Sequence, residues 1–320
     1  MQPEQIRTLA EKVMQNVGKV IVGKEDIVEK MLVSIICQGH ILLEDVPGTG
    51  KTLLAKSIST SIECDFRRIQ LTPDLLPSDI TGIHFYNQKE SDFTFRAGPI
   101  FSNIILADEI NRATPRTQSA LLECMEERQV TVDGVTKKLD RPFLVMATQN
   151  PIDIQGTFAL PEAQVDRFLM KLKLGYPSSE EGVSILRRFK ESNPSLTLEA
   201  VIHKNELIDA QDSYYMVHVS DDLLSYIIAI AEATRVHPDI MLGVSPRGTQ
   251  SLLRAIQGLA ILRGRTYATP DDIKEMVLPV MAHRIVVKGA LKLKAGMAEE
   301  LLLGIMKKIP VPSEEFMKND

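Results

Sequence analysis

The chain has 320 residues and a formal net charge of −5, and charged residues make up 25% of it. This length allows one large and one smaller domain, each with its own core. The acidic balance gives no support to a dedicated nucleic-acid binder, and no apolar run approaches the roughly 18 residues of a membrane span.

The amino-terminal residues lack the basic and apolar regions of an export signal. The three cysteines, Cys37, Cys64 and Cys124, are far apart in sequence and odd in number. We therefore expect neither a disulfide framework nor a zinc site, and a cytoplasmic protein.

The first part of the chain predicts two helices and a strand. Apolar residues recur every three or four positions over residues 5–21, which indicates an amphipathic helix. A second helix is expected over residues 24–38, and a buried strand over residues 41–43. A turn rich in Pro and Gly follows, and a helix should open at Lys51 and Thr52. This order of strand, turn and helix is typical of a phosphate-binding loop.

The residue types of the loop suit that chemistry. Gly48 and Gly50 let backbone N–H groups close around phosphate oxygens, and the helix N-terminus that follows favours an anion. Lys51 is expected to reach the β- and γ-phosphates of ATP, and Thr52 to give its hydroxyl to Mg²⁺. The general pattern G-x-x-x-x-G-K-[ST] has Asp45 in place of its first Gly, a position that serves the turn rather than the phosphate contact. The expected nucleotide-binding segment is completed by Pro47, Thr49 and Leu53.

The next hundred residues alternate between apolar runs and turn signals. A second strand is predicted over residues 66–71, and Pro73 and Pro77 predict irregular structure over residues 72–79. A short hairpin or loop insertion is expected over residues 82–98. The apolar run 104–107 suits the middle of a parallel sheet, and Thr114 with Pro115 predicts the start of a helix that ends near residue 127. Asp133 and Gly134 lie between two β-rich arms, which is a strong hairpin signal.

Further strands are predicted over residues 143–148 and 168–174. Strands that alternate with helices indicate an α/β fold, a parallel sheet flanked by helices. After Pro177 the pattern becomes helical, with a capping box at Ser178 and Glu181. Later helices should start near residues 221, 246 and 270, and residues 214–219 form a possible extended piece. We therefore predict a nucleotide-binding domain over residues 1–177 and a smaller all-helical lid over residues 178–320.

Two carboxylates follow the predicted central strand. Asp108 would bind Mg²⁺, and Glu109 would orient or deprotonate an attacking water. Asn150 ends the next strand, where its amide could position that water or simply serve a turn before Pro151. Arg167 lies just before the last predicted strand of the sheet, and Arg247 opens a helix after Pro177. Taken alone, both could be ordinary surface arginines.

The segments DVPGTGKT, IILADEINRA, ATQNP, LPEAQVDRF and GVSPRGT occur in this order. The set resembles the MoxR family of AAA+ ATPases, over about residues 21–284. The resemblance implies Walker A at Lys51 and Thr52, Walker B at Asp108 and Glu109, and sensor 1 at Asn150. It implies an arginine finger at Arg167 that points into a neighbouring subunit, and sensor 2 at Arg247 on the lid. It also implies adenine contacts at Val22 and Gly23, and a restraint on Glu109 by Gln70.

The function implied by the resemblance is Mg²⁺-dependent ATP hydrolysis in a ring, a homo-hexamer in the family's pattern, that remodels or matures protein clients. Proteins with a von Willebrand factor A domain are the implied partners. In the related branch of magnesium chelatase subunits, hairpins like the two predicted here tend to face a central pore. A nucleic-acid motor related to helicases is the alternative, supported by Lys137 and Lys138, and a nucleotide switch with negligible turnover is a third reading.

Overall fold

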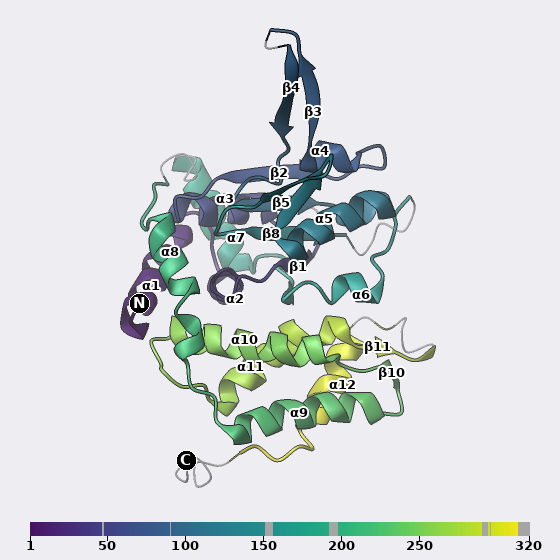
Figure 1. Ribbon diagram of the computed structural model, residues 1–320. Coiled ribbons are helices and arrows are strands. Elements are labelled where there is room, and N and C mark those ends of the chain that lie inside the picture. Colours follow the sequence, from purple (N-terminus) through teal and green to yellow (C-terminus); the bar gives the residue numbers. More distant parts are fainter. Residues whose placement is uncertain are drawn as a thin grey trace.

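The computed structural model describes residues 1–46, 48–89, 91–150, 156–191, 198–289, 294 and 296–312. In Figure 1 an upper body built around a sheet lies on a lower body of helices, and a long hairpin projects from the top. None of the described helices is long and apolar enough to cross a membrane.

The upper body contains a five-stranded parallel sheet, as the sequence predicts. Its strand order is β2-β5-β8-β1-β9, and every neighbouring pair runs parallel. All five strands therefore end at one edge of the sheet, which we call the carboxyl edge. The strands are β1 (Ile41–Glu44), β2 (Phe66–Gln70), β5 (Ile104–Asp108), β8 (Leu144–Gln149) and β9 (Met170–Leu172).

Two hydrophobic cores cover the two faces of this sheet, because successive side chains of a strand point to opposite faces. Ile41 and Leu43 belong to one core, with helices α1 (Pro3–Gly18), α2 (Glu25–Ile36) and α3 (Lys51–Ser61). Leu42 belongs to the other, with helix α5 (Pro115–Glu127). The predicted helix start at Thr114 is confirmed, since its hydroxyl accepts a hydrogen bond from the N–H of Thr117.

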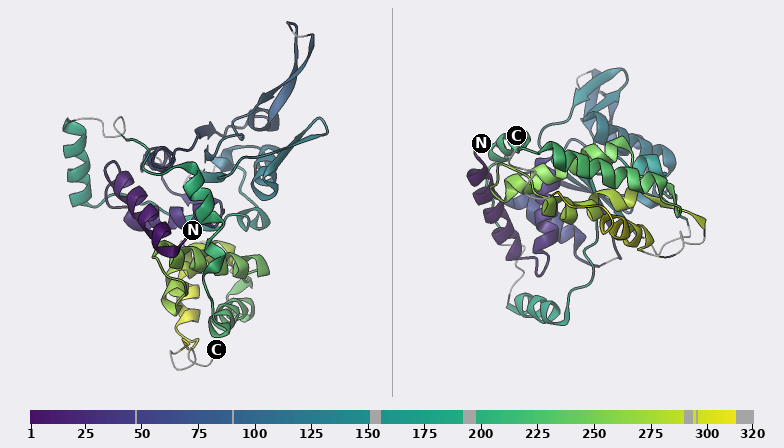
Figure 2. Two further views of the ribbon diagram at one scale, coloured as in Figure 1. Left: turned by 60° about the vertical axis from the view of Figure 1, so that its left-hand side comes forward. Right: turned by 90° about the horizontal axis from the view of Figure 1, so that it is seen from below.

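Both predicted hairpins are present. One pairs β3 (Gly82–Asn87) with β4 (Asp92–Ala97), and the other pairs β6 (Gln129–Val132) with β7 (Val135–Lys138). Figure 2 shows them projecting from the same side of the molecule. They brace each other, because His84 Nδ1 lies 2.8 Å from a carboxylate oxygen of Asp133 and Lys137 Nζ lies 4.7 Å from the centre of the Phe95 ring.

The prediction of irregular structure over residues 72–79 is wrong at its end. Helix α4 (Pro77–Thr81) begins at Pro77. Proline is tolerated in the first turn of a helix, where its missing N–H would have no intrahelical partner.

The helices that directly follow Pro177 lie beside the upper body. The predicted capping box is confirmed at the start of α7 (Ser179–Glu191), where Ser178 and Glu181 exchange backbone-to-side-chain hydrogen bonds. Arg188 of α7 donates to the carbonyl of Gly18 at 2.7 Å. Gln211, the last residue of α8 (Lys204–Gln211), donates to the carbonyl of Ile35 at 2.8 Å. The division at residue 177 stays a prediction.

The lower body holds the predicted lid helices, and their starts at residues 221, 246 and 270 are confirmed. They are α9 (Asp221–Val236), α10 (Pro246–Leu262), α11 (Pro270–Met281) and α12 (Met297–Met306). A small antiparallel ribbon of β10 (Ile240–Leu242) and β11 (Val286–Val287) joins them, which the sequence analysis did not foresee. The possible extended piece over residues 214–219 is confirmed only in its second half: residues 214–216 form a 3₁₀ turn, whereas Val217 is extended and His218 pairs with Tyr267 in an isolated parallel bridge.

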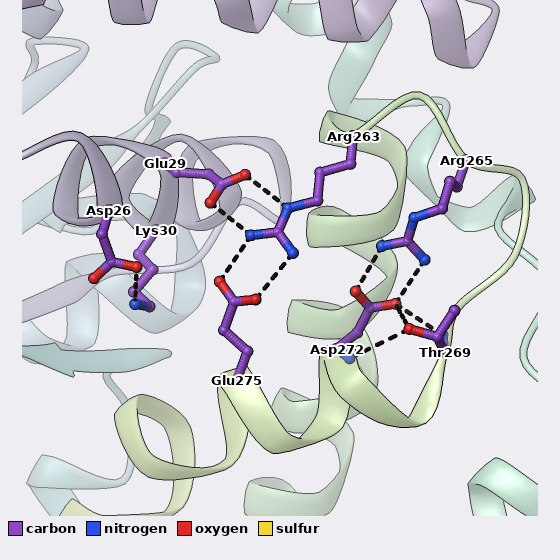
Figure 3. A network of polar contacts seen from close by, with 8 residues as sticks. All are labelled: Asp26, Glu29, Lys30, Arg263, Arg265, Thr269, Asp272 and Glu275. Carbon is purple, nitrogen blue, oxygen red and sulfur yellow. Dashed lines mark hydrogen bonds and ion pairs between the residues drawn. The ribbon is translucent and has the colours of Figure 1, made fainter.

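The lid is attached to the upper body by packing and by ion pairs. At Gly258 of α10 an added Cβ would lie 2.4 Å from Cys37 Sγ, so the two bodies approach closely there. Figure 3 shows Arg263 between Glu29 of α2 and Glu275 of α11, with two hydrogen bonds to each carboxylate at 2.8 to 2.9 Å. Beside it Arg265 pairs with Asp272, whose carboxylate also accepts from Thr269.

Candidate nucleotide-binding site

A cavity of about 410 Å³ lies at the carboxyl edge of the sheet, beside the ends of β1, β5 and β8. It brings together most of the residues that the sequence singled out. Its lining consists of Gly48, Gly50, Lys51, Thr52, Leu53, Arg68, Asp108, Glu109, Thr148 and Asn150.

The phosphate loop has the backbone that its glycines allow. Gly48 has a φ of 84° and Gly50 a φ of 89°, values that residues with a side chain rarely adopt. Gly50 directly precedes α3, so free N–H groups of the first helical turn face the cavity. Lys51 Nζ donates to the backbone carbonyls of Asp45 and Val46 at 3.1 and 3.0 Å. Thr49 donates to the carbonyl of Val46, and Pro47 lies outside the described residues.

The unusual Asp45 braces this loop. One of its carboxylate oxygens accepts a hydrogen bond from the backbone N–H of Val46 at 2.8 Å. The other accepts from the backbone N–H of Gly175 at 2.9 Å. Gly175 follows β9, the strand beside β1, so Asp45 fixes the loop to a second segment of the fold. The carboxylate thereby satisfies two backbone donors at a position where the general pattern has a glycine.

The two carboxylates after β5 are held differently. Asp108 Oδ1 accepts a 2.6 Å hydrogen bond from the hydroxyl of Thr148, which itself accepts from the N–H of Glu109 at 2.8 Å. Glu109 has a φ of 59°, in the left-handed region that is costly for a residue with a side chain. Such strain is found at functional sites, and here it turns the carboxylate of Glu109 into the cavity lining.

Two side chains of β2 connect these carboxylates. Arg68 donates to Asp108 Oδ2 through Nε at 3.1 Å and Nη2 at 2.7 Å, and Nη2 also donates to Gln70 Oε1 at 2.7 Å. Gln70 donates to Glu109 Oε2 at 2.9 Å, and Arg112 donates to the same oxygen at 3.2 Å. The contact between Gln70 and Glu109 agrees with the restraint implied by the family resemblance.

Arg68 and Thr148 line the cavity but were not predicted from the sequence. Arg68 precedes Gln70 by two positions, so both side chains leave β2 on the same face, and this spacing was the available signal. Thr148 lies two positions before Asn150 in the strand that had already been assigned to the site.

Asn150 is buried at the end of β8, and its carbonyl accepts a long 3.4 Å hydrogen bond from Asn111.

The predicted adenine contacts do not line the cavity. Val22 and Gly23 lie between α1 and α2, and Gly23 has a φ of 70°. An added Cβ there would overlap the carboxylate of Glu181 at 1.9 Å. Their role stays a prediction.

Arg167 and Arg247 lie in a different place. Both line a second cavity, of about 200 Å³, together with Glu126, Gly39, His40 and Leu169. Gly39 and His40 directly precede β1, and Leu169 directly precedes β9, so this cavity opens at the amino edge of the sheet. Glu126 contacts both arginines: Arg167 Nε lies 2.9 Å from Oε2, and Arg247 Nη2 donates to Oε1. Glu126 was not predicted as a site residue. The available signal was its position in the helix between Asp108 and Asn150, two predicted site residues.

The residue beside Arg167 is anchored to the lid. Asp166 accepts hydrogen bonds from Arg284 Nε at 2.6 Å and from the hydroxyl of Ser245 at 3.1 Å. Burial lowers the pKa of Arg284 to about 10, against the opposing effect of Asp166. Since Ser245 caps the helix that carries Arg247, the lid and the loop of Arg167 are held as one unit.

The residues at the carboxyl edge fit a nucleotide with Mg²⁺. A hydroxyl at Thr52 and a carboxylate at Asp108 are the oxygen donors that Mg²⁺ prefers, with phosphate oxygens and water completing its shell. No cluster of three or more His, Cys, Asp or Glu side chains suited to a metal occurs among the described residues. A site with few protein ligands is what a metal delivered with phosphates requires.

Comparisons with known proteins show which family this chain is similar to. Residues 40–170 match the ATPase family associated with various cellular activities (AAA), and residues 232–301 match an AAA lid domain. The chain is 48% identical to the uncharacterised Bacillus subtilis protein YeaC, over 97% of both chains. It is 41% identical to Chaperone MoxR1 of Mycobacterium tuberculosis, over 88% of this chain and 77% of that protein.

More distant and structural relatives point the same way. Protein MoxR of Paracoccus denitrificans is 30% identical over 92% of this chain and 94% of its own. A crystal structure from Cytophaga hutchinsonii, proposed to be an ATPase, matches with a TM-score of 0.91 and 39% identity, over 97% of both chains.

Proposed function

We propose, because this chain belongs to the MoxR family of AAA+ ATPases, that it hydrolyses ATP with Mg²⁺ in a ring of identical subunits and uses the energy to remodel partner proteins. The observation that carries this proposal is the meeting of Lys51, Thr52, Asp108, Glu109 and Asn150 at one cavity. These residues come from three separate segments of the chain, and each type has a defined task in phosphoryl transfer.

Each side chain would act on the nucleotide in its own way. Lys51 would exchange its two carbonyl partners for β- and γ-phosphate oxygens. Thr52 and Asp108 would hold Mg²⁺, which neutralises charge on the phosphates when bound. Glu109 would orient a water and accept its proton, and Asn150 would keep that water near the γ-phosphate. Thr148 would hold Asp108 in place through its 2.6 Å hydrogen bond.

The two arginines support a site shared between subunits. They lie at the amino edge of the sheet, whereas the phosphate loop lies at the carboxyl edge. The four residues of β1 span roughly 13 Å at about 3.3 Å each, so the sheet itself separates Arg167 from its own subunit's phosphates. We propose that Arg167 and Arg247 both act on the nucleotide of a neighbouring subunit. A contact between unlike edges is head-to-tail, and repeated around an axis it closes a ring.

The finer features rest on family membership. A ring of six subunits and partners with a von Willebrand factor A domain are proposed on that ground, and the Mycobacterium tuberculosis relative is named a chaperone. The exposed side chains of Ile83, Phe85, Tyr86 and Phe93 on the β3–β4 hairpin support contact with protein clients. A cytoplasmic location is proposed from the scattered cysteines. No observation favours a helicase-like motor, and Lys137, one of its two supports, lies over Phe95.

The direct test is ATP hydrolysis per subunit with and without Mg²⁺, measured as the protein concentration rises, with the Glu109→Gln variant as blank. Specific activity that climbs with concentration supports sites completed between subunits. If the specific activity does not change with concentration, size-exclusion chromatography must show whether the protein is already a ring. A monomer with full activity would overturn the proposal of a site shared between subunits. Activity no higher than the blank at all concentrations would contradict the ATPase.

A further inference from the structure

We propose that Arg68 is a positioning residue that gates the metal site: its guanidinium holds Asp108 until the carboxylate takes Mg²⁺, and it transmits that exchange to Glu109 through Gln70. The proposal rests on the proposed function, since it concerns the same cavity. It adds a residue and a step that the phosphate-loop motifs do not contain.

The first argument is the placement of the guanidinium. Asp108 Oδ1 is occupied by the hydroxyl of Thr148, and Oδ2 accepts two hydrogen bonds from Arg68. Both oxygens of the expected metal ligand therefore have partners within the chain. A guanidinium and a divalent cation repel each other, so Arg68 and Mg²⁺ compete for Oδ2.

The second argument is that Arg68 is able to leave. Its side chain is 48% exposed, while that of Asp108 is 13% exposed. Arg68 lies on β2, which is an edge strand of the sheet, and it lines the same cavity as Lys51 and Thr52. A long side chain at such a position can turn into solvent or towards phosphate without disturbing the core.

The third argument is the connection to the catalytic carboxylate. Arg68 Nη2 contacts both Asp108 and Gln70 Oε1, and the amide of Gln70 donates to Glu109 Oε2. Parallel pairing sets Gln70 directly opposite Asp108, so the chain of contacts is short and fixed by the sheet register. When Arg68 moves away, Gln70 loses the partner that orients its amide. The restraint on Glu109 is then reduced to Arg112.

The test is a Mg²⁺ titration of nucleotide binding, which does not depend on turnover. The full-length protein is mixed with a fluorescent ATP analogue in EDTA, and free Mg²⁺ is then raised. In Arg68→Ala the Mg²⁺ concentration at the binding midpoint should fall by at least about threefold, because a competing cation has been removed. Arg68→Lys, which keeps the charge but not the two-pronged contact, should give a midpoint between those of the other two proteins.

Arg67→Ala is the matched control, since Arg67 is exposed on the same strand and is not among the residues lining the cavity. Its midpoint should equal that of the wild type. An unchanged or higher midpoint in both Arg68 variants would overturn the gate. A large loss of analogue affinity in EDTA would also overturn it and make Arg68 a phosphate ligand. If the wild type binds no analogue at any Mg²⁺ concentration, it is the proposed function that fails.

Discussion

Arg167 of the nucleotide-binding domain and Arg247 of the lid lie against the same carboxylate, that of Glu126. The pair unites two parts of the chain that are 80 residues apart, and it does so at the edge of the sheet opposite to the phosphate loop. Two cations that share one carboxylate leave net positive charge in this cavity. The phosphates of a neighbouring subunit's nucleotide would complete that charge balance.

Arg167→Ala should abolish ATP hydrolysis while nucleotide binding persists. The arginine is expected to stabilise charge that develops on the transferring phosphoryl group, an effect of roughly 10³ to 10⁵ in rate for such fingers. Steady-state turnover and analogue affinity measure the two quantities separately. Near-wild-type turnover in this variant would remove Arg167 from the mechanism.

Lys51→Ala should weaken nucleotide binding itself, because the ammonium is expected to contact phosphates already in the ground state. Titration with a fluorescent ATP analogue measures the effect. Lys56→Ala is the control, since Lys56 lies on the exposed side of the same helix. Equal affinities in the Lys51 and Lys56 variants would count against Lys51 as the phosphate ligand.

Arg263→Ala should loosen the lid. Its four hydrogen bonds join α2 to α11, and the two carboxylates keep the pKa of Arg263 above its usual value. Because the ion pair is partly exposed, we expect a loss of only about 1 to 2 kcal/mol in the free energy of unfolding.

Urea unfolding measures the loss at Arg263. Lys274→Ala removes an exposed pair with Asp271 and should lower the free energy of unfolding much less than Arg263→Ala does. Equal unfolding midpoints in the Arg263 and Lys274 variants would show that the network in Figure 3 does not hold the lid.

The free energy of unfolding should fall as the pH drops below about 6.5. His40 is buried, accepting from the N–H of Val145 at Nδ1 and facing the carbonyl of Met125 at Nε2. Burial lowers its pKa from 6.5 to about 3, and burial also lowers the pKa of His283. Between pH 6.5 and about pH 3, the unfolded chain therefore binds a proton at His40 that the folded chain excludes. Each such histidine therefore costs up to about 1.4 kcal/mol per pH unit in that window.

Urea unfolding at pH 7.5 and pH 5.5 checks this effect. His40→Gln should be less stable than the wild type at pH 7.5, because packing is lost, but its stability should change less between the two pH values. His283 keeps part of the dependence. A variant with the full pH dependence of the wild type would contradict the role of His40.

Local signals predicted most of the fold. The apolar runs at residues 41–43 and 104–107 are short and are followed by turn signals, which favours buried strands over helices. Asp133 with Gly134 allows a tight turn with positive φ at both positions. The ribbon of β10 and β11 was missed because its strands have only three and two residues and are far apart in the chain. Pro77 was misread because a proline that breaks a helix and one that begins it look alike in sequence.

The site residues that belong to sequence motifs were predicted, and those that join the site from distant parts of the chain were missed. Lys51, Asp108 and Glu109 follow buried strands and could be placed from sequence alone. Arg68 contacts Asp108 across 40 positions, and Glu126 contacts Arg247 across 121. Nothing local in the sequence marks such pairs. The position of Arg247 away from its own phosphate loop also depends on how the lid is docked, which only the three-dimensional structure shows.

The measurement that tests the shared site most directly is subunit mixing. Arg167→Ala keeps the phosphate loop and loses the finger, whereas Glu109→Gln keeps the finger and loses the base. Each variant alone should be inactive. Mixed in equal amounts, about a quarter of the interfaces should combine an intact loop with an intact finger, so ATP hydrolysis should return to a matching fraction of the wild-type rate. A mixture that forms rings and stays as inactive as its components would contradict the account.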